Sequence, residues 1–301
     1  MSETTMDAPR TVTGVPGGRH PITFGIVTGQ HQLTLPELID LWQRAEALGF
    51  DSVFLFDHLM ALYGDPDGPC LEASTLLAAL ALTTKRVRIG VLVYGNTHRH
   101  PAVFAKEMVT VDHLSNGRLV VGIGTGWNER EHAAYGLPFP SAGDRVGMLD
   151  EALTVIRSLL NERRTTFAGR YYQLDDAPFS PKPIQPHLPI MVGGKRPKML
   201  QLIAKHADIW DAGGTPDEYR DRSVQIDRHC AEIGRDAGEI VRSHSFGADR
   251  LEDPAGFAAL IRTYRAAGVS QFLFDAPLTL KGQTAAAQIA QEIMPALRDD
   301  G

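Results

Sequence analysis

Cysteine is almost absent from the sequence, and so are long apolar runs and any excess of positive charge. Only Cys70 and Cys230 occur among the 301 residues, too few for a disulfide framework or a thiolate metal cluster. The 30 basic side chains are scattered and are outnumbered by 36 acidic ones, for a net charge of −6. Neither nucleic acid nor a membrane surface is therefore an expected partner, and a reducing cytoplasm is the expected location.

The N-terminus lacks the apolar core of a signal peptide, and no later stretch reaches the ~18 consecutive apolar residues of a membrane span. A share of 43% hydrophobic and 22% charged residues is typical of a globular protein. A prior of roughly 150 residues per domain suggests two domains, although a barrel of alternating strands and helices exceeds that length as one. We expect a flexible tail over residues 1–20 and a single domain over residues 21–301.

Short apolar, β-branched segments recur along the chain with helical patterns between them. Several are continuous apolar runs, which is typical of parallel strands covered on both faces. The predicted strands are 22–27, 52–56, 87–93, 119–123, 190–192, 208–211, 240–246 and 269–274. The predicted helices are 35–48, 72–82, 101–114, 144–160, 196–206, 216–233, 254–267 and 284–297.

Eight strands, each followed by a helix, predict an α/β fold of the (β/α)8 TIM barrel type, with a doubly wound sheet as the alternative. The fifth strand begins 71 residues after the fourth, at 190 against 119. That gap holds an aromatic and Thr-rich stretch, 164–176, followed by a Pro-rich stretch, 178–189. We therefore predict an insertion before strand five, made of a hairpin and an extended connector.

In such a barrel the reacting groups lie just after the C-terminal ends of the strands. Asp57 and His58 follow strand two, and Asn96 follows strand three. His58 can exchange a proton near neutral pH, while Asp57 can orient it or bind a ligand. The alternative is that Asp57 caps a turn and His58 is incidental.

A second histidine pattern, His98-Arg99-His100, resembles the His-x-His metal pair of barrel hydrolases. A metal site needs further ligands at later strand ends, and only Asp211 and Asp275 are suitably placed. His100 immediately precedes Pro101 and can instead satisfy backbone groups at the start of a helix. No metal is expected, and a metal-dependent hydrolase remains a minor alternative.

Two glycine-rich segments also follow strands. Gly122, Gly124 and Gly126 do not match the dinucleotide fingerprint, but they allow a flat ring to approach the backbone closely. Gly193-Gly194-Lys195-Arg196 stands before a helix and has the amides, helix dipole and cations of a phosphate site. In both cases an ordinary glycine turn is the alternative.

A series of longer motifs covers most of residues 22–297. They are AEALGFDS (45–52), FDH (56–58), RHPA (99–102), DHLSNGR (112–118), GIGTGWNE (122–129), REHAAYG (130–136), PKPIQ (181–185) and IMVGG (190–194). Together they resemble the luciferase-like monooxygenase superfamily of flavin and deazaflavin enzymes. The stretches GWNEREH (126–132) and YGLPFP (135–140) are most similar to its branch dependent on coenzyme F420, an 8-hydroxy-5-deazaflavin.

The resemblance implies hydride transfer between the deazaflavin C5 and a small organic substrate, with His58 as the catalytic proton donor or acceptor. It also implies a homodimer and a flavin or F420 reductase system as the source of electrons. The alternative is an FMN-dependent monooxygenase that uses reduced flavin and oxygen. A non-catalytic flavin-binding protein is a further alternative from another class.

The resemblance places the cofactor at the barrel mouth, on a third-strand bulge with a non-proline cis peptide near Leu92 and Val93. The residues expected to bind it are Asp57, Leu92, Val93, Asn96, Gly124, Trp127, Gly193, Gly194 and Lys195. Trp127 stands where sugar-phosphate dehydrogenases of the superfamily have an acidic Glu, which argues for an apolar or conjugated substrate. The substrate pocket is expected to be lined by segments 60–69, 128–143 and 164–189.

Overall fold

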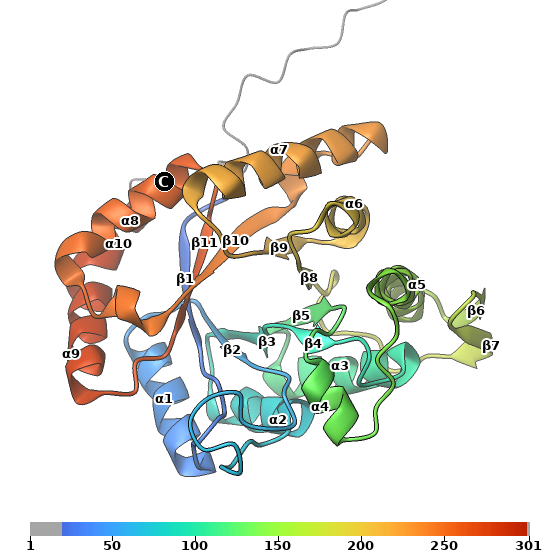
Figure 1. The fold of residues 1–301 in the computed structure, drawn as a ribbon, viewed down its shortest axis with the longest axis horizontal. Coiled ribbons are helices and arrows are strands. Elements are labelled where there is room, and N and C mark those ends of the chain that lie inside the picture. The colour runs from blue at the N-terminus through green and yellow to red at the C-terminus, as the bar shows by residue number, and fades with distance from the viewer. Residues whose placement is uncertain (1–19, 300–301) are drawn as a thin grey trace, which may run out of the picture.

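The computed structural model describes residues 20–299, so the predicted N-terminal tail, apart from His20, lies outside the described residues. Eight parallel strands form a closed ring, because β3 pairs with both β2 and β5. The strands are β1 (Thr23–Val27), β2 (Ser52–Leu55), β3 (Arg88–Val91), β5 (Leu119–Gly124), β8 (Ile190–Gly193), β9 (Ile209–Asp211), β10 (Val241–Phe246) and β11 (Gln271–Asp275). The predicted TIM barrel is confirmed, and Figure 1 shows the helices arranged around the strands.

The third predicted strand is interrupted. The peptide bond between Leu92 and Val93 is cis, as the resemblance predicted, and the two-residue strand β4 (Tyr94–Gly95) continues beyond it. Glycines on β5 make room for this irregular backbone: a Cβ on Gly122 would stand 2.0 Å from the Val91 carbonyl oxygen, and one on Gly124 would stand 2.9 Å from Val93 Cγ2. These two glycines are therefore required by the neighbouring strand itself.

The helices fall close to the predicted ranges, and five of them have Pro at the first or second position. They are α1 (Leu35–Ala47), α2 (Ala73–Thr83), α3 (Pro101–Ser115), α5 (Ala142–Asn161), α6 (Pro197–His206), α7 (Pro216–Glu232) and α8 (Pro254–Ala266). The last predicted helix is divided into α9 (Leu280–Gln288), η3 (Ile289–Ile293) and α10 (Met294–Asp299). The short elements α4 (Glu129–Ala134), η1 (Ala237–Glu239) and η2 (Ala248–Leu251) were not predicted. Within residues 20–299, no helix has both the length and the apolar character to cross a bilayer.

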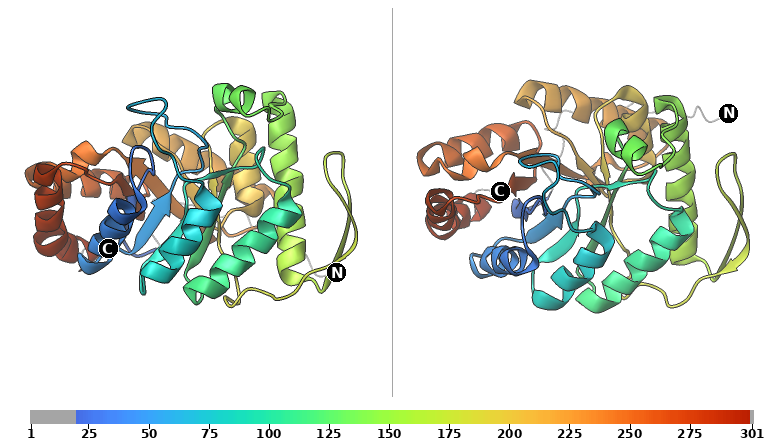
Figure 2. Two further views of the ribbon diagram at one scale, coloured as in Figure 1. Left: turned by 90° about the horizontal axis from the view of Figure 1, so that it is seen from below. Right: turned by 60° about the horizontal axis from the view of Figure 1, so that its bottom comes forward.

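The predicted insertion is present as an antiparallel hairpin of β6 (Arg164–Ala168) and β7 (Gln173–Pro178). Figure 2 shows it at the periphery of the barrel, beside α5. The Pro-rich connector then leads back to β8, with a cis bond between Ser180 and Pro181.

Two of the sequence motifs are explained by a contact that anchors this connector. Asp112, which is fully buried on α3, accepts hydrogen bonds from the Ile184 amide at 2.7 Å and from Gln185 Nε2 at 2.8 Å. Arg118, six residues later, donates to the carbonyl oxygens of Val87 at 2.7 Å and Ala81 at 2.7 Å. The DHLSNGR and PKPIQ motifs thus stabilise the barrel at a distance from its mouth.

We expect Asp112→Ala to lower the free energy of unfolding by about 3 kcal/mol, because the Ile184 amide and the Gln185 side chain lose their buried, charged acceptor. Urea unfolding measures the change. Asp40→Ala is the matched control: Asp40 is 59% exposed in an ion pair with Arg44, and its loss should change stability by less than about 1 kcal/mol. Equal changes in the two variants would contradict the anchoring role.

Candidate active site

A cavity of about 440 Å³ opens at the C-terminal ends of the barrel strands. It is lined by strand β4 and by residues at or just after the ends of strands β2, β3, β5, β8 and β9. Of the residues predicted from the sequence, it brings together Asp57, His58, Leu92, Val93, Gly124, Trp127, Gly193, Gly194 and Lys195. Segments 60–69 and 164–189, which were expected to line the substrate pocket, do not line this cavity, whereas Asn128, Glu131 and His132 of segment 128–143 do.

Asn96 is the predicted binding residue that does not line the cavity. It is buried. Its backbone N–H donates to the Gly124 carbonyl oxygen at 2.9 Å, and its side-chain Nδ2 donates to the Tyr172 hydroxyl at 3.1 Å. The side chain therefore ties the third-strand extension to the inserted hairpin. The assignment of Asn96 as a cofactor contact stays a prediction, with its Nδ2 already engaged by Tyr172.

Asp57 is a buried carboxylate that organises the loop after β4. Arg99 binds both of its oxygens, at 2.9 and 3.0 Å, and His98 Nδ1 lies 3.0 Å from Oδ2. The Gly95 amide donates to the same oxygen at 2.8 Å. Burial alone would raise the pKa of Asp57, but the hydrogen bond from His98 and the charge of Arg99 outweigh it and lower the pKa below its usual value. Asp57 thus serves mainly to hold this loop.

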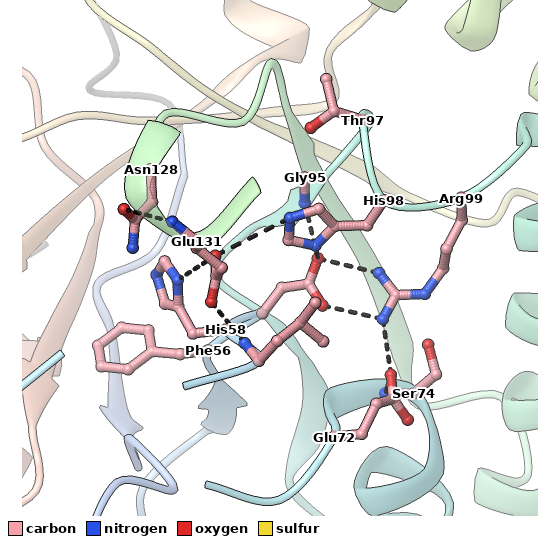
Figure 3. Close-up of polar contacts among 12 residues, drawn as sticks. Phe56, His58, Glu72, Ser74, Gly95, Thr97, His98, Arg99, Asn128 and Glu131 are labelled. Atoms are coloured by element: carbon pink, nitrogen blue, oxygen red, sulfur yellow. Dashed lines mark hydrogen bonds and ion pairs between the residues drawn. The ribbon is translucent and has the colours of Figure 1, made fainter. Parts of the chain in front are cut away.

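His58 lines the cavity and contacts Glu131, which extends from α4 (Figure 3). Its Nδ1 lies 3.1 Å from Glu131 Oε2, and the Leu59 amide donates to Glu131 Oε1 at 2.5 Å. Trp127 lies edge-on to the imidazole, with the ring centroids 5.6 Å apart. Sequence reasoning did not single out Glu131. The available signal was Asn128 three residues earlier, since Asn-x-x-Glu is a capping pattern that begins a short helix.

The two histidines of the His-x-His pattern do not converge on a common point. His98 contacts Asp57, whereas the His100 ring accepts a hydrogen bond from the Ala102 amide at 3.2 Å and caps α3. Among residues 20–299, no group of three or more potential ligands is arranged to hold a metal. The pattern therefore has a structural explanation at each residue.

The segment Gly193-Gly194-Lys195 borders the cavity, at the N-terminal end of α6. The expectation of free amides holds only in part. Gly194 donates its N–H to the Asp211 carbonyl oxygen at 3.2 Å, and its own carbonyl accepts from Trp210 Nε1 at 2.7 Å. Within residues 20–299, the N–H groups of Lys195 and Arg196 donate to no acceptor, and both side chains are exposed. Two cations and these amides remain available to an anion.

Residues 20–292 match the family model described as luciferase-like monooxygenase. The chain belongs to the luciferase-like monooxygenase family. Among curated relatives, the F420-dependent glucose-6-phosphate dehydrogenase of Microbacterium testaceum is 35% identical over 224 residues, covering 73% of this chain and 66% of the relative. The protein of the same name from Nakamurella multipartita is 34% identical over 261 residues, covering 83% of this chain and 76% of the relative. This family member thus spans less than two thirds of the first relative and about three quarters of the second.

Solved structures of the family's fold match more of the chain at lower identity. An F420-dependent secondary alcohol dehydrogenase in complex with an F420-acetone adduct has a TM-score of 0.84 and 21% identity, over 93% of this chain and 100% of that one. The coenzyme F420 dependent tetrahydromethanopterin reductase of Methanopyrus kandleri has a TM-score of 0.80 and 19% identity, over 92% and 100%. A riboflavin lyase with modified FMN has a TM-score of 0.78 and 17% identity, over 94% and 92%. These likenesses show the shared fold.

One further carboxyl lines the cavity of this family member. Asp211, at the end of β9, is buried and accepts hydrogen bonds from the hydroxyls of Ser243 at 2.9 Å and Ser245 at 2.7 Å. Within residues 20–299 it forms no ion pair, and burial raises its pKa to about 6. Sequence reasoning had named Asp211 only as a possible metal ligand.

We expect Asp211→Asn to change the pH dependence of stability. The folded protein holds a proton on Asp211 up to about pH 6, whereas the unfolded chain loses it near pH ~3.9. The wild-type free energy of unfolding therefore loses a contribution as the pH rises through this interval. The variant lacks that loss, so its stability relative to wild type should rise by on the order of 2 to 3 kcal/mol between pH ~4 and pH ~7. Urea unfolding across that range measures it, and a pH-independent difference would contradict the raised pKa.

Proposed function

We propose that this protein is an oxidoreductase that uses coenzyme F420 to transfer a hydride to or from a small organic substrate at the barrel mouth. Two curated relatives with 35% and 34% identity are named as F420-dependent enzymes. The observation that carries the proposal is the position of His58, which lines the same cavity as the Leu92–Val93 peptide and Lys195. One cavity thus contains a side chain that can carry a proton, a stretch of backbone against which a ring can lie, and a cation that can bind an anion.

The residues of the cavity fit such a cofactor. Part of the wall is bare backbone: a Cβ added to Gly213 would meet no atom within 4 Å. A flat ring can occupy such space. The residues that would hold the ring are Leu92, Val93, Gly124 and Trp127, and those that would hold the phosphate are Gly193, Gly194 and Lys195. When bound, F420 supplies the C5 carbon that accepts or donates the hydride.

His58 handles the proton that accompanies the hydride. Its Nδ1 faces Glu131, so Nε2 is the nitrogen that remains for the substrate. In the oxidation of an alcohol, Nε2 of neutral His58 would take the proton of the substrate hydroxyl group, while the bound cofactor would serve as the hydride acceptor. In the reverse direction His58 acts as the acid.

The substrate in this proposal is uncharged and is apolar or conjugated. Trp127, with 67% of its surface exposed, lies beside His58 and offers an aromatic face. Arg99, in the loop after β4, is not available to a charged substrate, because its guanidinium is bound to Asp57 and Glu72. With Lys195 assigned to the cofactor, no other Lys or Arg among residues 20–299 lines the cavity to bind a substrate phosphate.

The second candidate is an FMN-dependent monooxygenase, because the riboflavin lyase with modified FMN shares the fold at a TM-score of 0.78. FMN ends at its phosphate, whereas F420 continues into an acidic lactyl-glutamate tail. Arg196 and Lys198, both exposed beyond Lys195, favour the cofactor with the longer anionic tail.

The proposal also covers the domain organisation, the oligomeric state and the electron source of the enzyme. In this proposal the predicted domain 21–301, described by the structure up to residue 299, is a single barrel unit. Two copies form a homodimer, for which the exposed apolar side chains Leu82, Val103 and Leu114 on α2 and α3 provide support. A flavin or F420 reductase system in a reducing cytoplasm supplies electrons, in keeping with two free cysteine thiols.

We expect His58→Ala to lower kcat by at least about 100-fold while the Kd for F420 changes by less than about threefold. The reason is that the variant loses the proton carrier but keeps the cofactor contacts. Anaerobic assays with F420 and a panel of secondary alcohols measure turnover, with glucose 6-phosphate included as the charged comparison. His113→Ala, at an exposed position on α3, is the matched control. Equal losses of turnover and affinity would contradict the role of His58.

We expect Lys195→Met to weaken F420 binding by about tenfold and to reduce the salt dependence of the Kd, because an exposed cation at an anion site acts through screened charge. Fluorescence titration at several salt concentrations measures both effects. Lys85→Met, at an exposed site outside the cavity, controls for loss of net charge. An unchanged Kd would place the phosphate elsewhere.

A further inference from the structure

Glu131 is a buried acidic side chain to which the proposed mechanism assigns no role of its own beyond contact with His58. It extends from α4 toward the loop after β2, and its side chain is only 1% exposed (Figure 3). Oε1 accepts from the Leu59 amide at 2.5 Å, and Oε2 lies 3.1 Å from His58 Nδ1. His98 Nε2 stands farther away, at 3.9 Å from Oε2. The nearest imidazole contact is therefore with His58.

The charge state of Glu131 determines which atom of His58 carries hydrogen. Burial would raise the pKa of Glu131, but the hydrogen bonds with His58 and the Leu59 amide outweigh it and lower the pKa. A carboxylate can only accept hydrogen bonds, so His58 must donate through Nδ1–H. In neutral His58, Nε2 is then the unprotonated atom that can take a proton from the substrate.

We propose that Glu131 is a positioning residue that holds His58 in the Nδ1–H tautomer and thereby makes Nε2 the proton-carrying atom. The inference deepens the proposed function, and its catalytic part rests on that function. A carboxylate behind an imidazole fixes the orientation of the ring and stabilises the imidazolium that forms when the ring takes a proton.

The helix that carries Glu131 is bound to both neighbouring loops. Tyr135 donates through its hydroxyl to the Leu59 carbonyl oxygen at 2.6 Å, so Leu59 is held through its N–H and its C=O. His132 Nε2 lies 2.7 Å from Thr97 Oγ1, in the loop after β4. These contacts fix the position of the carboxylate relative to His58. Glu129, on the same helix, is exposed and does not line the cavity.

The other titratable groups around His58 do not replace Glu131. His31, from the loop after β1, has its ring centroid 6.0 Å away, and burial, followed by the charge of His58, lowers its pKa. Asp57 and His98 are bound to each other, and Asp57 also binds Arg99. Cys70 lies 3.7 Å from His31 Nδ1 and contacts His58 at its carbonyl oxygen, not at its ring, and burial raises the pKa of Cys70 to about 11. Glu131 is thus the one acceptor in contact with the His58 ring among residues 20–299.

The test compares Glu131→Gln with Glu129→Gln. Two-bond ¹H–¹⁵N NMR correlation on the protein without cofactor reports the tautomer and titration of His58, whose signals are assigned by their loss in His58→Ala. We expect wild type and Glu129→Gln to show Nδ1–H with an unprotonated Nε2. Glu131→Gln should show a mixture of tautomers, because a side-chain amide can donate to the ring as well as accept from it.

With F420, Glu131→Gln should lower kcat by at least about tenfold and shift the acidic limb of its pH profile, while the Kd for F420 changes by less than about threefold. Glu129→Gln should leave all three unchanged. If Glu131→Gln fails to fold, the test uses Glu131→Asp instead, which keeps the negative charge but shortens the side chain. The tautomer of wild-type His58 then provides the second measurement. A wild-type His58 with Nε2–H, or a Gln variant with unchanged tautomer and pH profile, would overturn the proposal. Absence of F420 binding to wild type would refute the proposed function alone, because the NMR measurement needs no cofactor.

Discussion

The buried ion pair between Asp57 and Arg99 is the interaction on which the arrangement of the site depends. A carboxylate buried at the exit of a barrel strand must be paired, because an isolated charge there is strongly disfavoured. Arg99 contacts both oxygens and continues to Glu72, at the start of α2. The pair therefore joins the ends of two neighbouring strands to the helix layer. His58, the next residue in the chain, acquires a fixed position from this junction.

The short helix α4 closes the other side of the site. Through Glu131 and Tyr135 it holds the backbone of Leu59, and through Glu131 it contacts His58. The barrel itself is shared by two F420-dependent enzymes and by a riboflavin lyase with modified FMN. Differences in chemistry among them must therefore arise from the side chains and loops at the mouth. In this chain those features are Trp127 beside the imidazole and the cations that follow β8.

Much of the fold could be predicted from the sequence because its signals are local. Apolar runs mark buried parallel strands, Pro and capping residues mark helix starts, and the strand-end rule located His58 and Lys195. The features that the sequence does not reveal are long-range contacts. Glu131 meets Leu59 across 72 residues, and Asn96 meets Tyr172 across 76, so no local spacing reveals either pairing. Helix α4 has six residues, too few for helical periodicity to be recognised.

The central claim is that the barrel mouth binds a deazaflavin rather than FMN. Parallel fluorescence titrations of the purified protein with F420 and FMN, each oxidised and reduced, test it most directly. The account predicts much tighter binding of F420 than of FMN in at least one oxidation state. Tighter binding of reduced FMN would contradict the account and indicate an oxygen-using monooxygenase, and binding of neither would contradict the assignment of the cavity as a cofactor site.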